Sequence, residues 1–296
     1  MKKIGRLLTA MITPFDKNGN IDYNQAKKLA NSLINSGSDG LVIGGTTGEA
    51  PSMSDEEKIQ LFKAIVEEVG DRGSVIAGTT DNNHIKSIEL SKEAEKVGVD
   101  ALLLTVPAYN KPQQTGLFFH FKAIAESTNL PCILYNVPGR TSLNMTTETT
   151  LKLAEINNVI GIKEASSDIE QITNIIKHSN DNFQVWSGND DETFGIMTLG
   201  GFGIVSVASN IIGNQIKKMM NHIIQGDFIK GSDEHKRLLP IFKALFWETN
   251  PVPIKYAVNK SGFNVGSTRL PMYAPSKEFT EKFDPIFDKY EIDLKN

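Results

Sequence analysis

One lysine occupies a position where an apolar strand is expected. The segment Val159–Lys163 is short, apolar and strand-like until its last residue, which carries a charge. Burying an ammonium group costs far more free energy than burying a methylene, so core strands rarely contain lysine. Loss of solvation favours the uncharged amine, and a free amine can attack a ketone to form a Schiff base. The alternative is that Lys163 ends the strand and points its ammonium group into water.

Polar groups lie at the ends of two other strand-like segments, Gly40–Ile43 and Cys132–Tyr135. The turn after Gly40–Ile43 carries Thr46 and Thr47 among glycines, and its hydroxyls and backbone N–H groups can hold a carboxylate. Tyr135 can relay protons, and the guanidinium of Arg140 can hold a carboxylate by two parallel hydrogen bonds. Each signal alone also fits an ordinary turn. Together with a buried amine, they predict a site for a small α-keto acid.

Eight strand-like segments alternate with helix-like segments along most of the chain. Most are apolar at consecutive positions, which is typical of strands covered on both faces. They are Leu7–Ile12, Gly40–Ile43, Ser74–Ala77, Ala101–Thr105, Cys132–Tyr135, Val159–Ile162, Gln184–Ser187 and Gly203–Val207. Eight such units predict an α/β fold, a closed (β/α)8 TIM barrel whose active site lies at the C-terminal ends of the strands. A doubly wound open sheet is the alternative.

The last third of the chain contains more helix than a closing segment needs. The helical patterns cover Asn210–Gln225, Asp227–Phe246, Pro253–Lys260 and Ser276–Tyr290. No flexible linker separates them from the rest. We therefore expect residues 1–225 to form the catalytic barrel and residues 226–296 to form a helical C-terminal extension packed on it.

The composition limits the classes of partner and of site that the sequence indicates. The 296 residues carry a formal charge of −4, so no basic surface indicates a nucleic-acid or membrane partner. No run of 18 apolar residues predicts a spanning helix. The single cysteine, Cys132, fits a reducing cytoplasm. The five histidines lack the spacing of a metal pair, and an N-cap role before a helix at Glu192–Leu199 explains Asn189–Asp191 more simply than metal binding.

The motifs together resemble the dihydrodipicolinate synthases, a branch of the lysine-dependent pyruvate aldolase/lyase family. The resemblance covers essentially the whole chain from Thr13 onward, and within the family the synthase branch is indicated mainly by Arg140. The segments that carry it are Gly45-Thr46-Thr47-Gly48-Glu49, Tyr135-Asn136-Val137-Pro138-Gly139-Arg140-Thr141, Gly161-Ile162-Lys163-Glu164-Ala165, Asn250-Pro251-Val252-Pro253-Ile254-Lys255 and Arg269-Leu270-Pro271.

The resemblance implies a Schiff-base-forming lyase of the class I aldolase type. It would condense pyruvate with L-aspartate-4-semialdehyde to 4-hydroxy-tetrahydrodipicolinate, the first committed step of diaminopimelate and lysine biosynthesis. Lys163 would form the Schiff base, with Tyr135 taking part in imine formation and proton transfer. Thr47 would join Tyr135 in a proton relay that Tyr109 completes from a neighbouring subunit. The lysine imine is the electron sink, so neither a metal nor an organic cofactor is implied.

The resemblance also assigns the binding groups and the assembly. Thr46 and Thr47 would face the pyruvate carboxylate, and Arg140 the carboxylate of the second substrate. Gly188 and Val205 would line the pocket through backbone groups. A homo-oligomer is implied, as a tetramer built from two dimers.

The chain departs from the family pattern at three positions. Ala108 replaces the first member of a common Tyr-Tyr pair that contributes to dimer packing. Lys86 stands where lysine-inhibited members commonly carry a glutamate, and Lys58 lies near the place of a histidine. Because an incoming lysine cation would meet Lys86 instead of a carboxylate, we predict that lysine does not inhibit this protein.

Two other functions stay open on the sequence alone. A sibling aldolase or lyase acting on a 2-keto-3-deoxy sugar acid or N-acetylneuraminate would keep Lys163 and Tyr135 but need a pocket for a polyol. A binding barrel that captures an α-keto acid without turnover would not need the relay of Thr47, Tyr109 and Tyr135, all of which are present.

Overall fold

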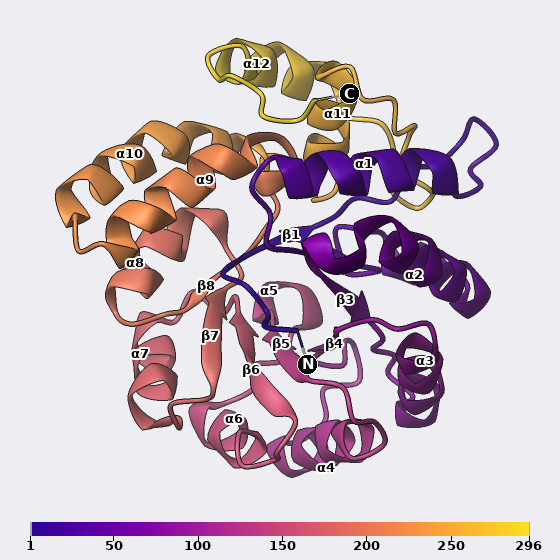
Figure 1. The fold of residues 1–296 in the computed structure, drawn as a ribbon, viewed down its shortest axis with the longest axis vertical. Helices are drawn as coiled ribbons and strands as arrows, with labels where there is room; N and C mark the ends of the chain where they lie inside the picture. Colours follow the sequence, from indigo (N-terminus) through magenta and orange to yellow (C-terminus); the bar gives the residue numbers. More distant parts are fainter. Residues whose placement is uncertain (1, 296) are drawn as a thin grey trace.

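The computed structural model describes residues 2–295 and contains eight parallel strands that close into a barrel in chain order (Figure 1). The strands are β1 (Leu7–Ala10), β2 (Gly40–Ile43), β3 (Ser74–Gly78), β4 (Ala101–Thr105), β5 (Cys132–Asn136), β6 (Val159–Glu164), β7 (Gln184–Ser187) and β8 (Gly203–Ser206). The predicted TIM barrel is confirmed, and the doubly wound alternative is excluded because β8 pairs with β1.

Helices surround the barrel; those before β8 connect successive strands, and α9 follows β8 (Figure 1). They are α1 (Tyr23–Asn35), α2 (Asp55–Val69), α3 (His84–Lys96), α4 (Gln114–Ala125), α5 (Pro138–Thr141), α6 (Thr147–Leu153), α7 (Ile169–His178), α8 (Thr193–Thr198) and α9 (Ser209–Ile224). The start of α2 is fixed by a capping box, in which Ser54 Oγ accepts from Glu57 N at 3.2 Å and Glu57 Oε2 accepts from Ser54 N at 3.0 Å.

Apolar side chains fill the inside of the barrel. The interior cluster contains Leu8, Ala10, Val42, Ile76, Leu103, Ile133, Tyr135, Val137, Trp186 and Val205. The opposite faces of the strands pack against the helices in a second, larger cluster. Burial of both faces explains why the strand segments read as continuous apolar runs.

Strand β6 is longer than its apolar run predicts, because it continues through Lys163 and Glu164. Lys163 is therefore a ladder residue whose register partners are Tyr135 on β5 and Trp186 on β7. Successive side chains of a strand point to opposite faces, so Lys163 and Glu164 leave β6 in opposite directions.

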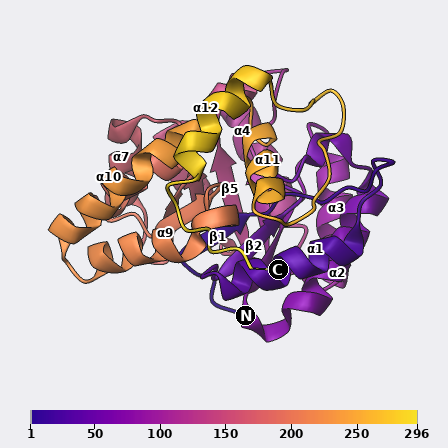
Figure 2. The same ribbon diagram turned by 90° about the horizontal axis from the view of Figure 1, so that it is seen from above.

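The C-terminal segment adds α10 (Phe228–Ala244), α11 (Val252–Lys260) and α12 (Lys277–Phe287). Figures 1 and 2 show α11 and α12 stacked beyond α1 at one side of the barrel. Tyr256 of α11 donates to Asp284 Oδ1 of α12 at 2.9 Å, and Ser32 Oγ of α1 donates to the Lys295 carbonyl at 2.6 Å. The predicted boundary at residue 225 falls between α9 and α10, and it stays a prediction.

The N-cap role predicted for Asn189–Asp191 is wrong. Residues Asp190–Glu192 form a 3-10 turn before α8, and no side chain there caps the helix. The buried carboxylate of Asp190 instead accepts from Ser206 Oγ at 2.5 Å and from the backbone N–H of Val207 at 3.1 Å. Asp190 thus ties the end of β7 to the end of β8.

Candidate active site

Lys163 lies inside the barrel with only 5% of its surface exposed. Its Nζ lies over the ring of Tyr135, 4.1 Å from the ring centroid. No carboxylate within residues 2–295 forms an ion pair with Lys163. Lys163 is therefore sheltered from water, as predicted. The alternative, in which its ammonium group points into solvent, is wrong.

The neighbouring carboxylate, Glu164, does not neutralise this amine. It points to the outer face, where it accepts from Asn136 Nδ2 at 3.1 Å, Gln171 Nε2 at 3.2 Å and Ser166 N at 2.8 Å. Burial raises the pKa of Glu164, while its hydrogen bonds to Ser166, Asn136 and Gln171 oppose that shift. Glu164 therefore joins the ends of β5 and β6 to α7 and directs its own charge away from the barrel interior.

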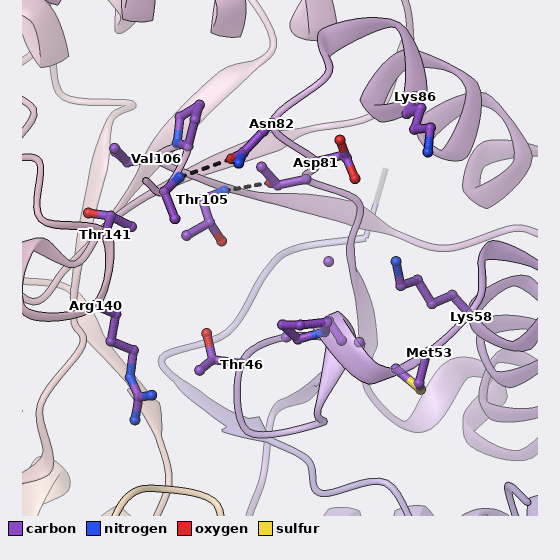
Figure 3. Close-up of a pocket in the computed structure, with 18 of the residues that line it drawn as sticks. Thr46, Met53, Lys58, Asp81, Asn82, Lys86, Thr105, Val106, Arg140 and Thr141 are labelled. Carbon is purple, nitrogen blue, oxygen red and sulfur yellow. Dashed lines mark hydrogen bonds between the residues drawn. The ribbon is translucent and has the colours of Figure 1, made fainter. Parts of the chain in front are cut away.

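A cavity of about 680 Å³ opens at the C-terminal ends of the strands. Thr46 and Arg140 line one side of it, and Lys58 and Lys86 line the other (Figure 3). Val137 belongs both to the cavity wall and to the interior cluster that holds Tyr135. The cavity therefore adjoins the barrel interior in which Lys163 and Tyr135 lie.

Thr46 and Thr47 face different surroundings. Thr46 lines the cavity, and its hydroxyl makes no hydrogen bond within residues 2–295. Thr47 is 3% exposed, and its Oγ1 accepts a hydrogen bond from Asn250 Nδ2 at 3.0 Å. The backbone carbonyl of Asn250 also accepts from Arg140 Nη2 at 3.3 Å. Asn250 is thus a residue of the site to which the sequence analysis gave no role.

A buried ion pair secures the threonine turn from the C-terminal segment. Lys255 Nζ lies 2.8 Å from Glu49 Oε1 and 4.0 Å from the centroid of the Phe15 ring. The second oxygen, Glu49 Oε2, accepts from the backbone N–H of Arg269 at 2.9 Å. Burial lowers the pKa of Lys255 to about 8, against the opposing attraction of Glu49. Glu49 and Lys255 both belong to sequence motifs, but nothing in the sequence pairs them.

The remaining predicted site residues divide into two groups. Gly188 and Val205 lie inside the fold: Val205 is fully buried, and the Gly188 N–H donates to the Glu164 carbonyl at 2.7 Å. A Cβ at Gly188 would lie 2.6 Å from Ala165 Cβ, so only glycine fits there. Tyr109 is different, because it is 91% exposed and has a left-handed backbone with φ of 75°. Within one chain it does not join the other site residues.

No helix between residues 2 and 295 combines the length and apolarity that crossing a bilayer requires. In the same part of the chain, histidine, cysteine, aspartate and glutamate side chains nowhere gather in a group of three able to hold a metal ion.

Over nearly its whole length, the chain is similar to known proteins of one family. The pattern of the dihydrodipicolinate synthetase family matches residues 3–289. A curated 4-hydroxy-tetrahydrodipicolinate synthase from Dehalococcoides mccartyi is 50% identical over 294 residues, covering 99% of each chain. The crystal structure of a dihydrodipicolinate synthase from Bacillus anthracis is 44% identical with a TM-score of 0.96, over 98% of this chain and 100% of the other. The enzyme from Cyanidioschyzon merolae, solved with lysine bound, is 40% identical with a TM-score of 0.94, over 95% of this chain and 96% of the other.

Proposed function

The chain belongs to the dihydrodipicolinate synthetase family, and we propose that Lys163 is the residue through which it performs the family's reaction. The activity is that of a 4-hydroxy-tetrahydrodipicolinate synthase, a Schiff-base-forming lyase that condenses pyruvate with L-aspartate-4-semialdehyde. The identity to curated synthases over nearly the full chain favours this activity over that of a sugar-acid aldolase. The reaction serves diaminopimelate and lysine biosynthesis.

Lys163 carries the covalent chemistry. Its free amine attacks the ketone carbon of pyruvate, the ketone oxygen leaves as water, and an iminium bond to Nζ forms. The iminium draws electrons from the neighbouring carbon, so the methyl group loses a proton and becomes an enamine carbon. That carbon attacks the aldehyde of the second substrate, whose oxygen takes up a proton. The amino group of the condensed chain then displaces Lys163 from the imine carbon, which closes the ring and restores the amine.

The phenol of Tyr135 supplies and removes protons in these steps. Its ring lies against the Lys163 ammonium position at 4.1 Å, so the reacting nitrogen and the phenol belong to one enclosed volume. A relay hydroxyl must be free to accept and donate. The resemblance gives this relay role to Thr47. Because the Thr47 hydroxyl already accepts from Asn250, we propose that Thr46, on the cavity wall, is the relay hydroxyl.

The carboxylates of the two substrates bind to different groups. The Thr47 hydroxyl and the backbone of the glycine-rich turn hold the carboxylate of pyruvate. Arg140, on the cavity wall, holds the carboxylate of L-aspartate-4-semialdehyde by a charge-assisted hydrogen bond. Gly188 and Val205 shape the inner wall.

Tyr109 completes the relay in a partner subunit of a cytoplasmic homo-oligomer, which we propose to be a tetramer of two dimers. The support is local: a tyrosine that is 91% exposed and held at a positive φ is costly for a lone chain. Sedimentation velocity of the parent and of Tyr109→Phe measures the assembly, and an activity assay of both proteins measures the contribution of Tyr109 to the rate. We expect an unchanged assembly with a much lower rate in the variant; a fully active monomer would contradict the assignment.

The observation that carries the proposed mechanism is the burial of Lys163 beside Tyr135, with no carboxylate of residues 2–295 paired to it. Its test is borohydride reduction of the protein in the presence of pyruvate, followed by peptide mapping. We expect a stable adduct, with the mass of reduced pyruvate, on the peptide that contains Lys163. Lys255, which is also buried, is the internal control and should stay unmodified. An adduct elsewhere, or none, contradicts the proposal.

A further inference from the structure

Asn250 touches two binding residues of the proposed site from outside the strands of the barrel. It lies between α10 and α11 and is 4% exposed. Its Nδ2 donates to Thr47 Oγ1 at 3.0 Å, and its backbone carbonyl accepts from Arg140 Nη2 at 3.3 Å. One residue of the C-terminal segment therefore contacts a candidate ligand of each substrate carboxylate.

The side chain of Asn250 is bonded differently from those of two other buried asparagines. Asn136 uses both ends of its amide: Nδ2 donates to Glu164, and Oδ1 accepts from Met145 N at 3.0 Å. Asn210 also uses both ends, with Nδ2 donating to the Ala10 carbonyl at 2.9 Å and Oδ1 accepting from Ile12 N at 3.4 Å.

Asn250 leaves its buried Oδ1 without a hydrogen-bond partner in residues 2–295. An unpaired buried acceptor is unfavourable for folding and is found mainly where a group has another task. The hydrogen bond to Thr47 is the single side-chain bond that Asn250 makes in this part of the chain. Its placement is better explained by what it does to Thr47 than by stability.

A threonine hydroxyl has one proton and can either accept or donate in a given direction. The Asn250 N–H occupies the acceptor side of Thr47 Oγ1, which leaves the Thr47 proton free for an anion. We propose that Asn250 is a positioning residue that fixes the Thr47 hydroxyl as a hydrogen-bond donor to the carboxylate of the keto acid. This inference rests on the proposed function and names the part of the chain that completes its pyruvate site.

A second contact keeps Asn250 in register with the threonine turn. Two residues beyond Thr47, Glu49 forms its buried ion pair with Lys255 in the first turns of α11. The turn after β2 and the start of α11 are thus joined twice, once by a neutral hydrogen bond and once by opposite charges. Because these two contacts already hold the turn that carries the Thr47 hydroxyl, that hydroxyl loses little conformational freedom when the substrate binds.

Steady-state kinetics of Asn250→Ala test the proposal, since this change removes the amide but keeps the carbonyl that Arg140 contacts. We expect the KM for pyruvate to rise about tenfold or more, the scale of one hydrogen bond to a charged group, while the KM for the semialdehyde stays within about twofold. An equal rise in both KM values, or no rise for pyruvate, overturns the proposal.

Two further variants separate positioning from a structural role. In Thr47→Val the hydroxyl is absent, so adding Asn250→Ala to it should raise the pyruvate KM by no more than about twofold. Additive effects in this double-mutant cycle overturn the proposal. Asn158→Ala is the matched control, because its Nδ2 bonds to three backbone carbonyls, of Ala125, Thr128 and Leu130, before β6. We expect it to lower the unfolding temperature without moving the pyruvate KM.

The isosteric variant Asn250→Asp gives a second readout if Asn250→Ala fails to fold. At neutral pH the introduced carboxylate accepts from Thr47 and turns its proton away from the substrate, so the pyruvate KM should exceed that of the parent by about tenfold or more. Below the pKa of the introduced carboxyl, its O–H can donate to Thr47 again, and the ratio of the two KM values should fall. A ratio that is independent of pH overturns the proposal.

Borohydride trapping with pyruvate distinguishes this inference from the proposed function. If Lys163 of the parent protein forms the adduct but Asn250→Ala requires no more pyruvate for half-maximal trapping, only the positioning role fails. If the parent forms no adduct at Lys163, the proposed function fails first. We expect labelling of Lys163 in both proteins, with the variant requiring about tenfold more pyruvate.

Discussion

Lys163 and Tyr135 are register partners on adjacent strands, and the Lys163 Nζ lies 4.1 Å from the centroid of the Tyr135 ring. An aromatic face attracts a cation without forming an ion pair with it, so the Tyr135 ring orients the lysine head group. A carboxylate in the same position would hold the amine as a paired ammonium. The pairing of two ladder residues therefore places a nucleophile and a proton carrier together without a mobile loop.

Removal of the Lys163 amine should abolish covalent catalysis. We expect Lys163→Ala to lower kcat by about a thousandfold or more, because the variant lacks the buried amine that forms the imine beside Tyr135. Lys163→Arg is the matched control, since it keeps a cation against Tyr135 but cannot form a Schiff base. Coupled assays of both variants should give similarly low rates, and near-parent activity in either would contradict the assigned role.

Removal of the Arg140 guanidinium should affect the second substrate more than the first. A charge-assisted hydrogen bond contributes about 1.5–3 kcal/mol, so Arg140→Ala should raise the KM for L-aspartate-4-semialdehyde by roughly 10- to 100-fold. Lys163 should still be trapped with pyruvate, because the adduct forms before the aldehyde enters. Kinetics varied in each substrate separately measure the difference, and an unchanged semialdehyde KM would favour another binding group.

The site residues that the sequence predicts are those that lie at the C-terminal ends of the barrel strands. Lys163, Tyr135 and Thr46 follow from a single rule, namely that the C-terminal ends of parallel strands meet. The apolar signal stopped at Ile162, one residue before the lysine, because Lys163 and Glu164 are buried through specific contacts and not through hydrophobicity. Strand ends predicted from apolar residues are therefore wrong where polar residues continue the strand.

The parts that the sequence did not predict come from outside the strands. Asn250 and Lys255 reach Thr47 and Glu49 from the C-terminal segment, across about two hundred residues. No periodicity relates such positions, and their motif showed only that they occur together in a family. The role of the Asp190 carboxylate is also not predicted, since its partners lie at the end of β8 and just beyond it, and not in the helix that follows Asp190.

Free lysine should not inhibit the enzyme. Lys58 and Lys86 both line the cavity, and in residues 2–295 no carboxylate forms an ion pair with Lys86. A ligand ammonium about 5 Å from an unpaired lysine meets a repulsion of about 3 kcal/mol at an effective dielectric constant of about 20. Activity measured with millimolar lysine checks this, and Lys86→Glu, which reverses the charge, is the variant in which inhibition should appear. Clear inhibition of the parent would contradict the prediction.

His120 on α4 should make the fold sensitive to mild acid. Burial first, and then the nearby His84, lower its pKa from 6.5 to about 4, while Asp81 opposes the shift. Between these values the unfolded chain binds a proton that the folded chain does not, so stability present above pH 6.5 is lost as pH falls toward 4. The loss should be about 1–2 kcal/mol, allowing for solvent screening of a partly exposed ring.

Urea unfolding at several pH values measures this contribution. We expect His120→Gln to flatten the pH dependence between 6.5 and 4 relative to the parent. His178, on the exposed side of α7, gives the matched control His178→Gln, which should leave the parent slope unchanged. Identical slopes in the parent and in His120→Gln would show that other groups govern the acid response.

The Glu49–Lys255 pair should stabilise the fold only as a pair. Both side chains are at most 3% exposed, so removing one partner leaves a buried charge without compensation. We expect Glu49→Gln or Lys255→Met alone to lower the free energy of unfolding by about 3–5 kcal/mol, and the double change to recover much of that loss. The exposed pair Lys152–Glu148 is the control, where either single change should cost less than about 1 kcal/mol. Chemical unfolding of the four proteins of the buried cycle measures the coupling, and additive losses would mean that the charges act independently.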